Sequence, residues 1–284
     1  MIDQKEIELL IRLLDDPDEE VFLHVEEKLL SFGETGIQYL ERAWENTFNA
    51  LLQERIENLI HKIQFKGILN ALELWHNSGS FDLLQGLLIV NRYQYPDIDE
   101  QKIINQIEII KREIWMQMMY SMNAMEKVRL MNNVFYNTFG FTGNIKNYHN
   151  PQNSYLSLVL ESKKGNPILL ACLYSILAQK LDIPVYGVNL PKHFILAYTD
   201  YDTKTNKTTV LFYINAFNRG QVFGRQEVLA FLKQLQLAPD PRFFTPCTNS
   251  EIIVRVIRNL IISYGQVGAT EKIEELKQML NLLS

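Results

Sequence analysis

Apolar residues recur at helical spacing through the first third of the chain. In the run from Ile7 to Leu14 they stand three and four residues apart, which places them on one face of a helix. Asp16 and Pro17 then suit the cap and the first turn of a second helix. We expect further helices over residues 21–30, 37–44, 56–75, 81–93 and 103–114. The pattern predicts a helical packing scaffold.

The middle of the chain contains a more uniformly apolar segment. Residues 166–181 are apolar in nearly every direction around a helix axis, which is typical of a helix at the centre of a domain. Asn166 suits the N-cap of this helix, and Pro167 suits its first position, where a missing N–H costs nothing. A shorter helix, residues 156–160, precedes it, and we expect one of two residues to cap it: Asn153 or Ser154.

Beyond this central helix the period changes to that of strands. Three segments are rich in β-branched and aromatic residues and are predicted to be strands: 185–188, 193–201 and 208–215. The polar stretch between the last two favours an antiparallel hairpin. Helical signals return in two places, residues 225–235 and 249–283, the latter as two helices. A central helix followed by strands predicts an α+β fold that is mostly helical.

Composition and charge exclude several classes of protein. With 284 residues, 47% of them hydrophobic and 21% charged, the chain has the composition of a soluble globular protein rather than a disordered one. A formal net charge of −5 argues against a nucleic-acid partner. The longest uncharged apolar stretch, 165–179, is shorter than the roughly 20 residues that a membrane span needs. Two cysteines and no export signal predict a cytoplasmic protein.

No segment carries the spacing of a metal or nucleotide site. The histidines and the two cysteines do not stand at the separations that zinc sites use. There is no Walker motif and no dinucleotide-binding glycine pattern. We therefore expect neither a metal nor another cofactor.

Several short motifs, in this order along the chain, resemble the SirB-type transglutaminase-like family. They are Phe139-Gly140-Phe141-x-Gly143-Asn144, Asn150-Pro151-x-Asn153-Ser154-Tyr155-Leu156, Lys164-Gly165-Asn166-Pro167, Gly187-Val188-Asn189-Leu190-Pro191-x-His193-Phe194 and Tyr213-Ile214-Asn215-Ala216-Phe217. The helix with Arg255-x-x-Arg258-Asn259-Leu260 is similar to the tetratricopeptide-like tail of that family. The resemblance implies a papain-like transglutaminase fold.

The helical pattern and the resemblance together predict a division of the chain into three parts. Residues 1–94 form a helical region whose short, closely joined helices are typical of HEAT-like repeats. Residues 95–240 form the transglutaminase-like domain. Residues 241–284 form a tetratricopeptide-like helical hairpin, which is expected to pack on that domain because one such unit cannot stand alone.

Active members of this family use a cysteine, a histidine and an aspartate, and the resemblance places these three roles on this chain. The cysteine at the start of the central helix corresponds to Pro167, which has no nucleophilic atom. The histidine corresponds to His193. The carboxylate corresponds to Asn215, which can orient an imidazole but carries no charge. The triad is therefore expected to be degenerate.

Other residues offer substitute nucleophiles, each with a simpler explanation. Cys172 lies five positions beyond Pro167 on a different helix face, so it is expected to be a buried core residue. Cys247 stands in a connector and reaches His193 only if that connector folds back. Ser154 and Ser157 lack the glycines of a nucleophile elbow, so a capping or solvated hydroxyl is the simpler role.

Two hypotheses about function follow. The first is a non-catalytic module that binds a protein or peptide partner. Its expected binding residues are Asn153, Tyr155, Asn166, His193 and Asn215. The second is a hydrolase or transamidase acting on amide or peptide bonds, with His193 as base and a displaced cysteine or serine as nucleophile. His193 itself is open to two interpretations: a structural side chain hydrogen-bonded to Asn215, or a residue that lines a retained cleft.

Overall fold

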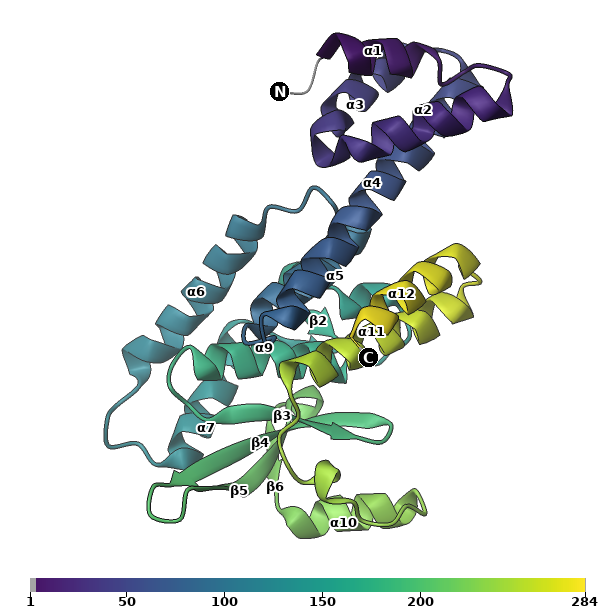
Figure 1. Ribbon diagram of the computed structural model, residues 1–284. Coiled ribbons are helices and arrows are strands. Elements are labelled where there is room, and N and C mark those ends of the chain that lie inside the picture. The colour runs from purple at the N-terminus through teal and green to yellow at the C-terminus, as the bar shows by residue number, and fades with distance from the viewer. Residues whose placement is uncertain (1–3, 284) are drawn as a thin grey trace. The chain divides into compact units, whose positions relative to one another are not determined.

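The computed structural model describes residues 4–283 and divides into two compact units, one ending at Leu74 and the other beginning at Trp75. The helices of the first unit are α1 (Gln4–Arg12), α2 (Glu19–Ser31), α3 (Ile37–Glu45) and most of α4 (Ala50–Asn77) (Figure 1). The boundary between the units falls inside α4, so it does not coincide with the expected boundary after residue 94. The three-part division of the chain stays a prediction.

The first unit is held together by an apolar core and by one arginine. Its core gathers residues from all four helices, among them Ile7, Leu29, Leu40 and Ile56. Nη1 of Arg55 on α4 donates to two carbonyl groups that follow α1, those of Leu14 at 2.6 Å and Asp16 at 3.0 Å. Because these carbonyls stand where α1 has ended, the guanidinium replaces hydrogen bonds that the helix no longer makes.

The prediction that Asp16 caps α2 was wrong by two residues. The cap is Asp18, whose Oδ1 accepts the N–H of Glu20 at 2.9 Å, and the helix begins at Glu19. Asp16 instead accepts the N–H of Asp18 in the preceding turn. Pro17 therefore lies in this turn and not in the first turn of the helix. Both aspartates are good caps, and the sequence alone does not decide between them.

The second unit contains the remaining helices and all the strands. Its elements before the central helix are α5 (Leu83–Gln94), α6 (Glu100–Gln117), α7 (Ala124–Asn132), a π-helical turn (Asn133–Thr138), β1 (Thr142–Gly143), α8 (Leu156–Ser162) and β2 (Lys164–Gly165). Those from the central helix onward are α9 (Pro167–Gln179), β3 (Val185–Leu190), β4 (His193–Asp202), β5 (Lys207–Asn215), β6 (Gln221–Phe223), α10 (Arg225–Gln234), α11 (Asn249–Gln266) and α12 (Thr270–Leu282). The predicted α+β fold, mostly helical with a small sheet, is confirmed.

The central helix α9 is buried along twelve consecutive residues, from Pro167 to Ala178. Helix α9 begins at the predicted residue, because Oδ1 of Asn166 accepts the N–H of Leu169 at 2.9 Å. At its other end, Oγ of Ser175 donates to the carbonyl of Val185 at the start of β3, at 2.7 Å. This bond ties α9 to the sheet.

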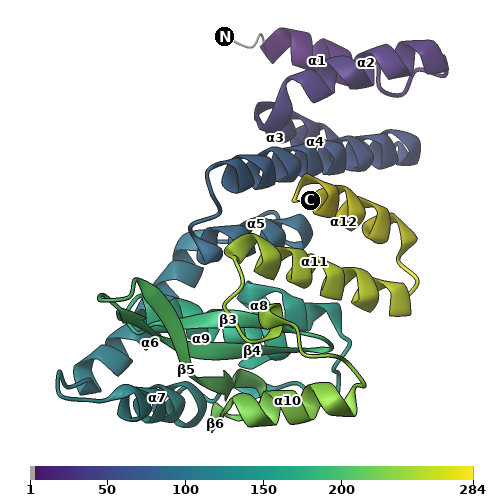
Figure 2. The same ribbon diagram turned by 60° about the horizontal axis from the view of Figure 1, so that its bottom comes forward.

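The main sheet is antiparallel, in the order β3-β4-β5-β6 (Figures 1 and 2). The predicted pairing of β4 with β5 is confirmed, with Leu196 opposite Ile214, and the short strand β6 was not predicted. One sheet face packs against α10 through a core that includes Leu190, Ile195 and Tyr213. Helix α9 lies on the other side of the sheet (Figure 2).

The expected cap of α8 was also wrong. The N-cap is Tyr155, which makes no side-chain capping bond, and neither Asn153 nor Ser154 caps this helix. Both of these residues form a 3₁₀ turn before α8, and both are buried. Their polar groups bond to other segments of the domain, as described below.

The chain ends in the predicted pair of helices, α11 and α12. Helix α11 starts with a complete capping box between Thr248 and Glu251. It approaches β3 closely at Gly187, where a Cβ atom would come within 3.0 Å of Ile252. This close approach places α11 next to the turn between β3 and β4.

Candidate functional site

A cleft of about 280 Å³ lies at the N-terminal end of α9. Its lining comes from four segments: 148–149, 166–168, 192–194 and, on α11, Arg255, Asn259, Ile262 and Ser263. The cleft therefore brings together Asn166, Pro167 and His193, which sequence analysis had singled out separately. Two of the three residues to which the resemblance assigns triad roles, Pro167 and His193, line it.

The start of α9 forms one wall of the cleft. Asn166 is buried, and its two side-chain atoms are both used: Oδ1 caps the helix and Nδ2 donates to Oγ of Ser154 at 2.7 Å. Pro167 follows as the first helical residue, and its ring supplies no atom that can attack a carbonyl. The helix start is thus held by two side-chain hydrogen bonds of Asn166, and Pro167 offers no nucleophilic atom to the cleft.

His193 stands at the first position of β4, opposite Leu190 across a two-residue turn. Its ring centroid lies 6.1 Å from that of Phe231 on α10. Burial lowers the pKa of His193, a side-chain hydrogen bond with Asn215 opposes this, and the positive charge of Arg255 lowers the pKa further. The imidazole is therefore biased toward its neutral form.

Asn215 ends β5 and faces the same side of the sheet as His193. Since Leu196 pairs with Ile214, Asn215 falls opposite Ile195, and residues 193 and 195 share a face. Oδ1 of Asn215 also accepts the N–H groups of Phe217 and Asn218, each at 3.1 Å. Asn215 therefore orients the turn that follows β5 while it contacts the histidine.

Two cationic side chains in the cleft had not been predicted as site residues. Lys192 occupies the turn before His193 in the left-handed region, with φ of +59°, and is exposed. Arg255 comes from α11, where Nη1 donates to Oδ1 of Asn189 at 2.8 Å and to the carbonyl of Leu190 at 3.3 Å. One signal was available in the sequence, because Arg255 and Asn259 are four residues apart and share a helix face.

Comparison with known proteins decides the family. A family model described as the transglutaminase-like superfamily matches residues 101–258, more than half of the 284 residues. The chain belongs to the transglutaminase-like superfamily. The cleft lies in this transglutaminase-like region, with one wall on the adjoining helix α11.

Several curated proteins are similar to this chain. The UPF0162 protein of Xylella fastidiosa (strain Temecula1) is 28% identical over 216 residues, which cover 71% of this chain and 73% of that protein. Human F-box only protein 21 is 29% identical over 153 residues, covering 54% of this chain and 24% of that protein. The UPF0162 protein of Haemophilus influenzae is 35% identical over 71 residues, covering 25% and 27%. No solved structure matches the chain. The resemblance to SirB-type transglutaminase-like proteins is confirmed.

Three of the five expected binding residues, Asn153, Tyr155 and Asn215, do not line the cleft, and the first two are buried in the interior of the transglutaminase-like domain. Nδ2 of Asn153 donates to the carbonyls of Asn147 and Tyr148, at 2.6 and 3.1 Å, and its Oδ1 accepts from Asn144 at 2.8 Å. The buried hydroxyl of Tyr155 lies 3.0 Å from that of Tyr264. These residues brace the segments around the cleft.

The two cysteines of the transglutaminase-like protein both lie outside the cleft lining. Cys172 is fully buried in α9, as predicted, and burial raises the pKa of its thiol. Sγ of Cys247 donates to the carbonyl of Gly187 at 3.3 Å, and burial raises its pKa to about 12. Both thiols are thus protonated at neutral pH and poorly nucleophilic.

Neither candidate serine lines the cleft. Oγ of Ser154 accepts the hydrogen bond from Asn166, and the backbone N–H of Ser157 donates to Oδ1 of Asn91 at 2.8 Å. Across residues 4–283, no hydrogen bond links His193 to a cysteine, serine or threonine side chain.

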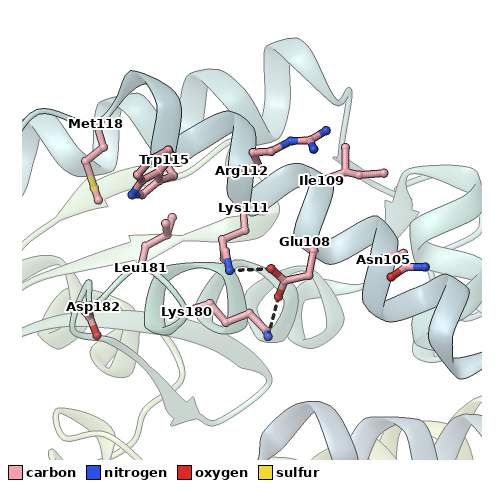
Figure 3. Close-up of a pocket in the computed structure, with 10 residues that line it drawn as sticks. All are labelled: Asn105, Glu108, Ile109, Lys111, Arg112, Trp115, Met118, Lys180, Leu181 and Asp182. Carbon is pink, nitrogen blue, oxygen red and sulfur yellow. Dashed lines mark hydrogen bonds and ion pairs between the residues drawn. The ribbon is translucent and has the colours of Figure 1, made fainter.

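A larger groove of about 730 Å³ lies between α6 and the turn after α9 (Figure 3). Its centre holds Glu108, which pairs with Lys111 at 2.6 Å and with Lys180 at 2.9 Å, and these contacts lower the pKa of Glu108. The exposed ring of Trp115 lies at one end of the groove. Because acidic and basic side chains both line the groove, it shows less charge preference than the cleft beside α9, whose lining has no aspartate or glutamate.

Within residues 4–283, no three His, Cys, Asp or Glu side chains cluster as metal ligands would. In the same range, no helix has the combination of length and apolar character that crossing a membrane requires.

Proposed function

We propose that the transglutaminase-like domain is a non-catalytic module that binds a peptide segment of a partner protein in the cleft beside α9. One observation carries the proposal: a proline ring stands at the helix start, on the cleft wall, where the active pattern needs a thiol. The cleft contains His193, while Pro167 supplies no attacking atom. Binding without bond cleavage is the activity that such a site supports.

The lining of the cleft suits a peptide. Tyr148 and Ile262 are 41% and 56% exposed and offer apolar contact surface at its edge. The side-chain amide of Asn259 makes no hydrogen bond to any residue between 4 and 283, so its donor and acceptor are available to a peptide backbone. Such a mixture of apolar and amide groups is common where extended peptides bind.

The alternative hypothesis, an amide hydrolase or transamidase with a displaced nucleophile, receives less support. Neither Cys172 nor Cys247 lines the cleft, and both thiols have raised pKa values. The thiolate is the form that attacks, so both are poor candidates. Ser154 is buried and hydrogen-bonded to the helix cap.

The catalytic part of the proposal is tested with an electrophilic thiol probe, a serine-reactive probe and an amine-transfer assay on full-length protein. We expect no labelling or turnover that depends on His193, so wild type and His193→Ala give the same signal. A Pro167→Cys variant tests whether the assay detects a thiol at the helix start. Turnover by the wild type that disappears in His193→Ala contradicts the proposal.

The binding part is tested on an array of random peptides of about twelve residues, which is shorter than the roughly 20 residues that one side of a standard interface contributes. Ile262→Trp narrows the cleft, and Val267→Trp is a matched control, because Val267 is also exposed but does not line the cleft. We expect Ile262→Trp to lose peptides that the control keeps. Equal binding by both variants, or no binding by the wild type, overturns the proposal.

A further inference from the structure

We infer that the cleft beside α9 recognises a carboxylate group of its peptide ligand, held by Arg255, Lys192 and the first turn of α9. The inference rests on the proposed function and adds the chemical class of the bound group. It comes from charge and hydrogen-bonding capacity that the protein itself leaves unused.

The lining of the cleft is cationic in a chain that is acidic overall. Arg255 and Lys192 are among the lining residues, and no aspartate or glutamate is. The chain as a whole carries five more acidic than basic side chains. A concave site with one sign of charge concentrates ligands of the opposite sign.

Hydrogen bonds hold the side chain of Arg255 in place, but no ion pair with a residue in the range 4–283 neutralises its positive charge. Its Nη1 is held by Asn189 and Leu190, which fixes the plane of the guanidinium. Its Nη2 has no partner, and Arg255 forms no ion pair within residues 4–283. Burial lowers the pKa of Arg255, and the nearby charge of Arg258 acts in the same direction. An anion next to Nη2 would offset this unfavourable burial of charge and would gain a charge-assisted hydrogen bond.

Lys192 contributes the second positive charge from another direction. It is exposed and forms no ion pair with any residue of the described range 4–283. Its left-handed backbone, unusual for a residue with a long side chain, belongs to the tight turn that places it beside His193. A flexible ammonium group here can follow an anion that Arg255 orients.

The start of α9 adds a backbone donor. Pro167 has no N–H, and Asn166 caps the N–H of Leu169. The remaining first-turn donor, the N–H of Ile168, has no acceptor within residues 4–283, and Ile168 lines the cleft. A helix N-terminus favours negative charge, so this donor acts together with the two cations.

A peptide can supply a carboxylate from its C-terminus or from an acidic side chain, and three probes separate these sources. All are N-acetylated tripeptides: trialanine with a free C-terminal carboxylate, the same peptide as its C-terminal amide, and an Ala-Ala-Glu peptide amide. Binding to full-length protein is measured by ligand-observed NMR. We expect at least one carboxylate probe to bind about tenfold or more tightly than the neutral amide, the effect of one charge-assisted contact.

A matched pair of variants tests the charge of the cleft without disturbing the fold. Ile262 is exposed on α11, so Ile262→Glu places a carboxylate in the cleft while Ile262→Gln has the same shape without the charge. We expect Ile262→Glu to remove the preference for carboxylate probes and Ile262→Gln to retain it. Lys192→Asn, which keeps a residue that tolerates the left-handed backbone, is expected to reduce the preference.

The outcomes separate this inference from the function on which it rests. Preference for the free C-terminus or for the glutamate probe supports the inference and names the source. Equal binding of the acid and amide probes overturns the inference and leaves peptide binding intact. Failure of all tripeptides and of the peptide array overturns both. Displacement of the carboxylate probe by inorganic phosphate at much lower concentration than by acetate overturns the assignment to a carboxylate.

Discussion

Two groups of polar side chains near the start of α9 differ in how their hydrogen-bonding capacity is used. The first, which we name the inner amide cluster, is buried or half-buried and hydrogen-bonded within the domain; it consists of Asn144, Asn153, Ser154 and Asn166. The second, the cleft donors, retains unused capacity within the described residues; it consists of Lys192, Arg255 and Asn259. The two groups lie within one domain, so the same energetic rules for buried and exposed polar groups apply to both.

This difference distinguishes the polar residues that stabilise the fold from those that are available to bind a ligand. A buried polar group without a partner costs free energy, so interior groups find partners within the protein. Donors that line a cleft are satisfied by water and can exchange it for a ligand. We therefore expect substitutions in the inner amide cluster to reduce stability, and substitutions among the cleft donors to reduce binding.

The largest loss of stability is expected from Asn153→Ala. This change leaves the carbonyls of Asn147 and Tyr148 and the amide of Asn144 without their partner. Removing one partner of a buried hydrogen bond costs about 1–3 kcal/mol, so we expect a total loss of about 3 kcal/mol in the free energy of unfolding. Urea denaturation measures it, and Asn147→Ala is the control, because the Asn147 side chain is exposed. A loss below that of the control would break the comparison.

A smaller loss is expected from Asn166→Ala. The variant loses the cap of α9 and the hydrogen bond to Ser154, and a lost cap typically costs about 1 kcal/mol, to which the second bond adds about 1 kcal/mol. Ser154→Ala removes the second bond alone, so the difference between the two variants isolates the cap. Equal losses in the two variants would show that Asn166 does not stabilise the helix start.

The start of α9 was readable from sequence because local rules fix it. Asn166 and Pro167 suit adjacent positions at a helix N-terminus and nothing else nearby competes with them, so this boundary was predicted correctly. The strands were found for a similar reason, through β-branched and aromatic runs. The caps of α2 and α8 were predicted wrongly, because several good capping residues stand side by side and tertiary contacts choose among them.

The grouping of the cleft donors could not be predicted from local sequence patterns. Lys192 lies in a turn and Arg255 on a helix far along the chain, and only the packing of α11 against β3 brings them together. The spacing of Arg255 and Asn259 predicts that they share a helix face. The sequence does not show which part of the domain this face packs against. Asn153 and Tyr155 were expected to bind a ligand, whereas the structure uses their polar groups inside the domain.

A third prediction concerns His193, which lines the cleft together with Lys192 and Arg255. Its pKa is lowered in the folded protein by burial and by Arg255 on α11, against the opposing contact with Asn215 on β5; Phe231 of α10 adds an uncharged neighbour. The unfolded chain therefore binds a proton more readily, so folding stability falls as pH drops below the ordinary histidine value of 6.5.

We expect His193→Gln to lose less stability than the wild type between about pH 7 and about pH 5, the range in which an ordinary histidine gains its proton. The difference should be smaller than the loss caused by removing the helix cap. Chemical denaturation of both proteins at several pH values measures it, and His149→Gln is the control, since His149 lies in the cleft lining but is exposed. Parallel pH profiles for wild type and His193→Gln would show that His193 is not held neutral.

The smallest effect on stability is expected from Lys192→Asn, among the cleft donors. Lys192 is exposed and makes no ion pair within residues 4–283, and asparagine tolerates its left-handed backbone. The free energy of unfolding should therefore change by less than about 0.5 kcal/mol, as at most exposed positions. The same variant should weaken binding of a carboxylate peptide, which Asn153→Ala, outside the cleft lining, does not do when it is folded. A Lys192→Asn protein that loses stability but keeps its ligand would reverse the comparison, because it would place this lysine with the residues that hold the fold.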